Sequence, residues 1–270
     1  MAELPEVFDR SVRCVLGFAG RRGPLVSPMA FWADGASVWM STPAASVKAA
    51  ALRARPDCAV YIPPPVGGGQ GLIARGHARV YGLHDPLGLA VHAPVVSAAM
   101  AALAARNAGT ILGYVQDASV VPARFRPHNR VAVRIALSDL SSVRAVAPAA
   151  GIAPTLPTLV SPGVRRAVSG HREIVLALQH PNGEITVGPA VWGQGFSLDL
   201  PPGTPLPEGA AAVAHVGSDP KHRPTQVTGL SLVGQIAGGR LRPQRATWWE
   251  GFKLTTAAVS QSPPSLVLPD

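Results

Sequence analysis

"VLGFAGRRGPLVSPMAFWADGASVWMST", residues 15–42, contains three apolar runs separated by glycine-containing turns. The Asp34-Gly35 pair between two of these runs is typical of a β-hairpin turn, and the glycines of GRRG mark an earlier turn. The stretch therefore predicts three consecutive strands, over residues 11–20, 24–35 and 36–42.

A short helix is expected next, in "ASVKAAALRARPDCAVY", residues 45–61. Thr42-Pro43 and Ser46 suit the start of a helix, and the alanines that follow favour helix. Pro56 ends it, because proline lacks a backbone N–H and disfavours helix in the residue before it.

The remainder of the first half predicts further strands and one longer helix. Strands are expected over residues 58–64, 71–82 and 129–146. Residues 85–109 are expected to be helical, with a break or kink at Pro94.

The second half repeats this order. Residues 172–202 have the same strand and turn pattern as residues 12–43, and later strands match in the same sequence, which predicts about six strands in each copy. Between Leu200 and Ala210, however, the second copy has no counterpart of the helix that carries Lys48. The duplication points to two similar β-barrels. We expect a first unit over 1–146, a Pro/Ala-rich linker over 147–163 and a second, degenerate unit over 164–270.

Composition supports a mainly β protein with short helices. Hydrophobic residues make up 47% and charged residues 14% of the 270, with 28 Gly and 28 Pro, which favours strands and turns. Gly, Pro or Arg interrupts every apolar run before the roughly 18 residues of a membrane span. The N-terminus does not resemble a signal peptide. We therefore predict a soluble, cytoplasmic protein with no membrane partner.

The net charge of +9 is unevenly distributed. Residues 1–145 carry 15 basic and 8 acidic side chains, whereas residues 146–270 carry 9 and 7. Neither half has a basic run interleaved with aromatics, so no nucleic-acid partner is expected. The first half either attracts a small anion or has a solvated arginine-rich surface, and composition does not choose between them.

Lys48 is one of only three lysines, against 21 arginines. It lies at the expected start of a helix, where unpaired N–H groups and a partial positive charge favour a bound phosphate. A solvated lysine on an amphipathic helix is the alternative, and the residues alone leave the two open.

No other motif indicates chemistry. The sequence has no G-x-S-x-G, H-E-x-x-H or C-x-x-C, and the histidines lack convincing ligand spacing. Cys14 and Cys58 fall in apolar strands and are expected to be core thiols. We predict no metal site and identify no catalytic residue.

The ordered series over residues 8–82 resembles the pyridoxamine 5'-phosphate oxidase-like, FMN-binding split-barrel superfamily. The matching features are the G-x-P turn, Ser27-Pro28, the Asp-Gly hairpin, Ser41-Thr42, the Ser-x-Lys helix and the glycine-containing strand 71–82. The resemblance implies two tandem split β-barrels that form a pseudo-dimer within one chain, with one intact site.

The resemblance also implies roles for individual residues. Ser46 and Lys48 would hold the phosphate of FMN or of the deazaflavin coenzyme F420, with Ser41 and Thr42 beside it. The strand formed by Ser27, Pro28, Met29 and Ala30 would line the ring. From the second half, Trp248, Trp249 and Lys253 would supply the facing wall, although core packing explains either tryptophan equally well.

By this resemblance, the chain is expected to be an FMN- or F420-dependent oxidoreductase that transfers hydride to or from an unknown small substrate. Such chemistry belongs to the cofactor, so the lack of paired carboxylates is compatible with it. The alternatives are a haem- or flavin-binding protein without turnover, with His77, His215 or His222 as haem ligands, and a degenerate barrel with no cofactor. A further homodimer is possible.

Overall fold

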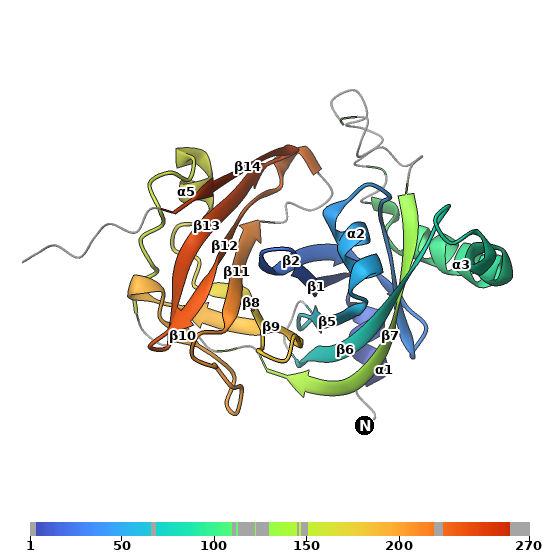
Figure 1. Cartoon of the computed structure of the whole chain (residues 1–270), viewed down its shortest axis with the longest axis horizontal. Helices are drawn as coiled ribbons and strands as arrows, with labels where there is room; N and C mark the ends of the chain where they lie inside the picture. Colours follow the sequence, from blue (N-terminus) through green and yellow to red (C-terminus); the bar gives the residue numbers. More distant parts are fainter. Residues whose placement is uncertain are drawn as a thin grey trace, which may run out of the picture.

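The computed structural model of the chain describes residues 4–65, 69–109, 112, 122, 130–144, 146, 151–218 and 224–259. Two antiparallel sheets of seven strands each form most of this structure, one from each half of the chain (Figure 1). The predicted mainly β fold with a tandem, duplicated arrangement is confirmed.

The first sheet is built from residues 13–143. Its strands are β1 (Arg13–Gly20), β2 (Gly23–Ala30), β3 (Trp32–Ala33), β4 (Ser37–Pro43), β5 (Asp57–Ile62), β6 (Gly71–Tyr81) and β7 (Arg130–Val143). They lie in the order β2-β1-β5-β6-β7-β4-β3. The Asp34-Gly35 turn is present as predicted: Gly35 has φ +89°, and the Asp34 carboxylate accepts a hydrogen bond from the Ser37 N–H at 2.7 Å.

The second sheet is built from residues 173–258. Its strands are β8 (Glu173–Gln179), β9 (Ile185–Trp192), β10 (Leu198–Asp199), β11 (Ala211–Ser218), β12 (Thr228–Ala237), β13 (Arg240–Glu250) and β14 (Lys253–Ala258). They lie in the order β10-β9-β8-β11-β12-β13-β14.

Five strands correspond between the two sheets in order and pairing, namely β2-β1-β5-β6-β7 with β9-β8-β11-β12-β13. The sixth strand of the first sheet has no such counterpart in the second. In the first sheet β4 pairs with β7, whereas the returning strand of the second copy, β10, is two residues long and pairs with β9. The place beside β13 is taken by β14, from the end of the chain. The second copy therefore does not end on one closing strand as the first does, because a turn at Gly251 (φ +58°) separates β13 from β14.

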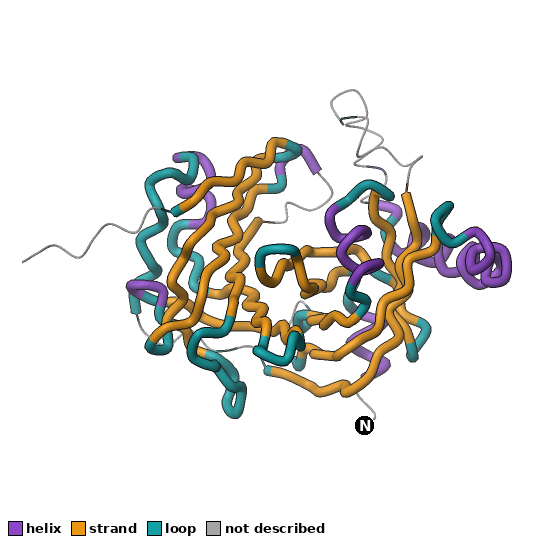
Figure 2. Tube along the Cα trace, viewed as in Figure 1, coloured by secondary structure: helices purple, strands orange, loops and turns teal. Residues whose placement is uncertain are grey.

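The helices lie outside the sheets (Figure 2). They are α1 (Leu4–Arg10), α2 (Val47–Ala54), α3 (Pro86–Arg106) and α5 (Pro162–Val168). The helix α3 continues through Pro94, so the alternative of a break there is wrong. With 21 residues and a mean hydropathy of 1.8, α3 is also long and apolar enough to cross a membrane, although Gly88 and Pro94 interrupt its apolar run as expected. Helices in soluble proteins pass the same test, so this is weak evidence for a span.

A shared apolar cluster joins the two sheets, and we call it the seam. It contains Val15, Ala19, Ala59, Tyr61 and Val143 from the first half and Ala177, Ile185, Val187, Val213 and Val233 from the second. At its centre β1 and β9 approach so closely that a Cβ on Gly17 would lie 3.0 Å from the Cβ of Val187. Separate cores lie within each half. Leu156 and Val160, in the expected linker, are buried in the core of the second half.

Candidate anion-binding site

Lys48 extends from the first turn of α2 across to β2. Its Nζ donates a hydrogen bond to the Ser27 hydroxyl at 2.7 Å and lies 2.9 Å from the Met29 sulfur. Ser27 and Met29 are two residues apart on one strand, so their side chains share the face that α2 covers. The lysine is therefore partly buried between helix and strand, and the alternative of a freely solvated side chain does not describe it.

The surroundings of Lys48 are unfavourable for a positive charge. Burial lowers its pKa from 10.5 to about 8, and the positive charge of Arg130 acts in the same direction. In the part of the chain that the structure describes, no carboxylate forms an ion pair with Lys48. A half-buried ammonium without an acidic partner is costly unless another anion supplies the opposite charge.

Arg130 is the second cation of this cluster. It opens β7, which pairs with β4 so that Arg130 lies opposite Pro43. Its Nε donates to the Ser41 hydroxyl at 2.9 Å and its Nη2 to the Ser41 carbonyl at 2.7 Å. Sequence reasoning missed Arg130, because only the pairing of two strands almost 90 residues apart brings it to Ser41.

Two hydroxyls lie at the N-terminus of α2. Ser46 is the N-cap residue, and its Oγ accepts a hydrogen bond from the Ala49 N–H at 3.2 Å. The same Oγ lies 3.0 Å from the Oγ1 of Thr42, which is buried. Ser46 thus has a structural role in starting the helix. Its hydroxyl proton is available to a ligand when Thr42 is the donor of the bond between the two hydroxyls.

Together these residues form what we call the Lys48 cluster. It consists of Ser27, Ser41, Thr42, Ser46, Lys48 and Arg130. Cations, hydroxyls and a helix N-terminus are donors that suit a phosphate group. Ser41 and Thr42 are neighbours on β4 and point to opposite faces of that strand, so Arg130 with Ser41 approaches from a different side than Lys48, Ser46 and Thr42. Five of the six members were predicted from the sequence, although their binding role stays a prediction.

The other predicted residues of β2 lie beside this cluster. Met29 is buried in the core of the first half, Ala30 is partly buried and Pro28 is exposed. Their contact with a flavin ring stays a prediction.

The predicted residues of the second half are not part of the Lys48 cluster. Trp248 is 9% exposed and belongs to the core of the second half, in keeping with the core-packing interpretation. Trp249 stacks on His215 with ring centroids 5.3 Å apart. Lys253 is exposed at the start of the edge strand β14. Their proposed contact with a cofactor stays a prediction.

The histidines named for haem have other partners. His77 is exposed and pairs with Asp57 at 2.9 Å. His215 is buried, its Nδ1 lies 3.1 Å from the Ser231 hydroxyl, and burial lowers its pKa to about 4. His222 lies outside the described residues. Among the described residues, no group of three metal-ligating side chains occurs.

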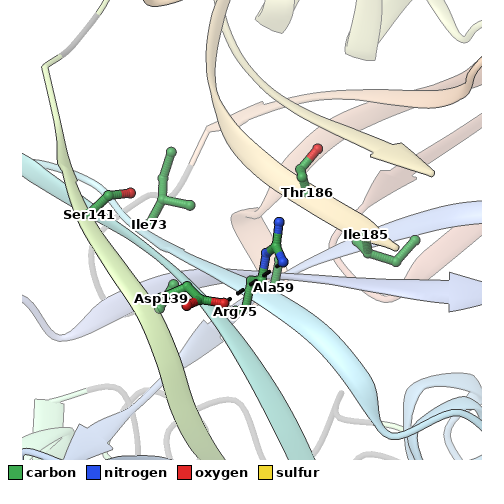
Figure 3. Close-up of a pocket in the computed structure, with 8 residues that line it drawn as sticks. Ala59, Ile73, Arg75, Asp139, Ser141, Ile185 and Thr186 are labelled. Carbon is green, nitrogen blue, oxygen red and sulfur yellow. Dashed lines mark ion pairs between the residues drawn. The ribbon is translucent and has the colours of Figure 1, made fainter. Parts of the chain in front are cut away.

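A cavity of about 410 Å³ opens where the sheets meet, apart from the Lys48 cluster. Figure 3 shows its principal charged residue, Arg75, beside Asp139 of β7. Arg75 also forms an ion pair with Glu184, which precedes β9. Ala59, Ile73, Ala74, Ser141, Ile185 and Thr186 complete the lining. The only cation in this lining is thus neutralised by carboxylates from both halves.

Comparisons with known proteins give a likeness of structure only. No family model and no curated protein matches the sequence. Among solved structures, the chain is similar to an FAD-binding protein from Mesorhizobium loti, with 18% identity and a TM-score of 0.40, over 52% of this chain and 91% of that one.

Two further solved structures show a similar degree of likeness. An F420 reductase is 20% identical, with a TM-score of 0.35, over 50% of this chain and 94% of that one. A protein from Clostridium acetobutylicum, described as of the pyridoxinephosphate oxidase family, is 15% identical, with a TM-score of 0.34, over 53% and 87%.

Proposed function

We propose that the Lys48 cluster holds the phosphate of FMN or of coenzyme F420, and that the chain is a flavin- or deazaflavin-dependent oxidoreductase. The observation that supports this most directly is the half-buried ammonium of Lys48, which has no carboxylate partner among the described residues. A phosphate beside Lys48 and Arg130 would supply the missing negative charge. The reaction would move a hydride to or from a small substrate, and the bound cofactor would supply that chemistry.

Individual residues have distinct parts in this proposal. Lys48 and Arg130 would neutralise the phosphate, and Ser27 and Ser41, which already bind these cations, would hold them in place. The α2 N-terminus would add its partial positive charge. The exposed side of β2, at Pro28, would face the ring.

A carrier or sensor that binds the cofactor without turnover is the second candidate. It is favoured by one observation: the Lys48 cluster, as far as the structure describes it, contains cations and hydroxyls but no carboxylate or histidine to move a proton. Lys48, whose pKa of about 8 would otherwise suit proton transfer, would be held in its charged form by the bound phosphate.

The visible absorption spectrum of the purified chain, titrated separately with FMN, F420 and haem, tests the proposal. We expect the flavin or deazaflavin band to shift on binding, and then to bleach when a reductant and an acceptor substrate are supplied in turn. Binding without turnover over a broad substrate screen would favour the carrier. A Soret band on haem addition alone, or no binding at all, would refute the proposal.

The pH dependence of cofactor binding should follow Lys48. Since its pKa is about 8 without ligand, Lys48 is charged below that pH and loses its proton above it. A phosphate monoester is already fully ionised by about pH 7. We expect the affinity for FMN or F420 to stay level near pH 7 and then to fall by up to about tenfold per pH unit above pH 8. The affinity stops falling above the pKa that Lys48 has in the complex, which the bound phosphate raises.

Folding stability of the ligand-free chain should change in the opposite direction. Between about pH 8 and the unfolded lysine pKa of 10.5, the unfolded state binds the proton that the folded state has lost, so stability rises with pH. Fluorescence titrations and urea unfolding at a series of pH values measure the two slopes. Affinity that is flat from pH 7 to 10 would show that Lys48 does not contact the phosphate.

A further inference from the structure

A second cavity, of about 260 Å³, lies on another part of the boundary between the halves. The turn between β1 and β2 forms one wall, with Gly20, Arg21, Arg22, Gly23 and Leu25. Arg245 of β13 and Thr256 of β14 form the other wall. We call this the arginine cavity.

The β1–β2 turn is held firmly against the second sheet. Gly23 has φ +109°, and a Cβ there would lie 3.7 Å from Val233 and 3.9 Å from Ala211. The Arg55 guanidinium donates a hydrogen bond to the Gly20 carbonyl at 2.9 Å, which fixes the other end of the turn. The position of Arg21 and Arg22 beside the second sheet is thus a consequence of packing.

The lining carries three positive charges and no negative one. Arg21 and Arg22 are exposed at the turn, and Arg245 is partly buried on the sheet. Within the described ranges, none of the three forms an ion pair with a carboxylate. Thr256, the hydroxyl of the lining, lies 3.0 Å from that of Thr247 across the same strand pair.

The 410 Å³ cavity provides an internal comparison. There, the start of β9 meets β5, β6 and β7 of the first half, whereas here the β1–β2 turn and the start of β2 meet β13 and β14 of the second half. In that cavity Arg75 is neutralised by Asp139 and Glu184. In the arginine cavity, cations from both halves face one another instead. Like charges brought together in this way repel, and an anion between them removes the repulsion.

We propose that the arginine cavity binds a small, multiply charged anion, through a phosphate or through carboxylates. Guanidinium groups suit both, because their planar N–H pairs match two oxygens of either group. The cavity is distinct from the Lys48 cluster but shares β2 with it, since Leu25 precedes Ser27 by two residues on the same strand face. The proposal does not depend on the identity of the cofactor.

Isothermal titration calorimetry with pyrophosphate and, separately, with citrate tests this site at low ionic strength. We expect one of the two anions to bind, which identifies phosphate or carboxylate as the ligand chemistry. Arg245→Gln should weaken that binding by about tenfold or more, as loss of a charged hydrogen bond does. Raising the salt to about 0.5 M should weaken it as well.

Three further variants make the result specific. Lys48→Ala should keep the binding, which separates this site from the Lys48 cluster. Arg166→Gln, on the exposed side of α5, removes the same charge elsewhere and should have little effect. Arg245→Lys should restore part of the affinity, and thermal melts without ligand should show that Arg245→Gln remains folded. Binding of neither anion, equal losses in Arg245→Gln and Arg166→Gln, or loss in Lys48→Ala alone would each overturn the proposal.

Discussion

Lys48→Met is expected to weaken binding of FMN or F420 by about 10- to 100-fold, which is the usual effect of losing a charged hydrogen bond. The methionine side chain has a similar length and no charge, so its packing against Met29 and the position of α2 on β1 and β6 should survive. Arg130 would remain, and its charge accounts for the residual affinity.

The same substitution should raise the stability of the ligand-free chain. The folded state holds the Lys48 ammonium half-buried and without a carboxylate partner in the described structure, so removing the charge relieves an unfavourable interaction. Opposite changes in affinity and stability are typical of a residue kept for binding. Cofactor titration and urea unfolding on the same preparations measure both.

Lys253→Met is the matched control. It removes the same side chain from an exposed edge strand of the second sheet, and neither quantity should change much. If Lys253→Met lowered cofactor affinity as strongly as Lys48→Met, the predicted facing wall would gain support. If Lys253→Met lowered it and Lys48→Met did not, the assignment of the phosphate to Lys48 would be wrong. Reduced stability of Lys48→Met would show that the lysine is structural.

Val187→Asp is expected to destabilise the chain by about 3–5 kcal/mol, since it buries an uncompensated charge. Val187 is 3% exposed at the centre of the seam and faces Gly17, which leaves no room for water or for a counter-ion. Because Val187 packs in the seam between the two sheets, weakening this contact should let the two sheets unfold in separate transitions.

Leu254→Asp is the control, because it introduces the same aspartate at an exposed position. Leu254 is 65% exposed on β14, so the same charge should cost less than about 0.5 kcal/mol there. Urea unfolding followed by tryptophan fluorescence and by circular dichroism distinguishes one transition from two. A change of less than about 1 kcal/mol in Val187→Asp would mean that the halves do not depend on each other through the seam.

The sequence by itself determined most strands of the first half, the helix α2 and much of the repeated order of strands. The predicted strand over 24–35 is divided into β2, which pairs with β1, and β3, which pairs with β4. The elements predicted correctly depend on local signals: the Asp34-Gly35 turn, the Ser46 cap and Pro56 act within a few residues of their own positions. The choice of Lys48 as the central residue also came from the sequence, from the scarcity of lysine and its place at a helix start.

Only the tertiary structure decided which distant groups share a site. The pairing of β4 with β7 brings Arg130 to Ser41, and the packing of α2 on β1 and β6 brings the Lys48 side chain within reach of Ser27 on β2. Long-range pairing also makes the second sheet differ from the first: β14 lies beside β13, in the position that β4 has beside β7. Strand pairing over long separations depends on the register of whole strands and on the area they bury together, and no short segment of the sequence carries that information.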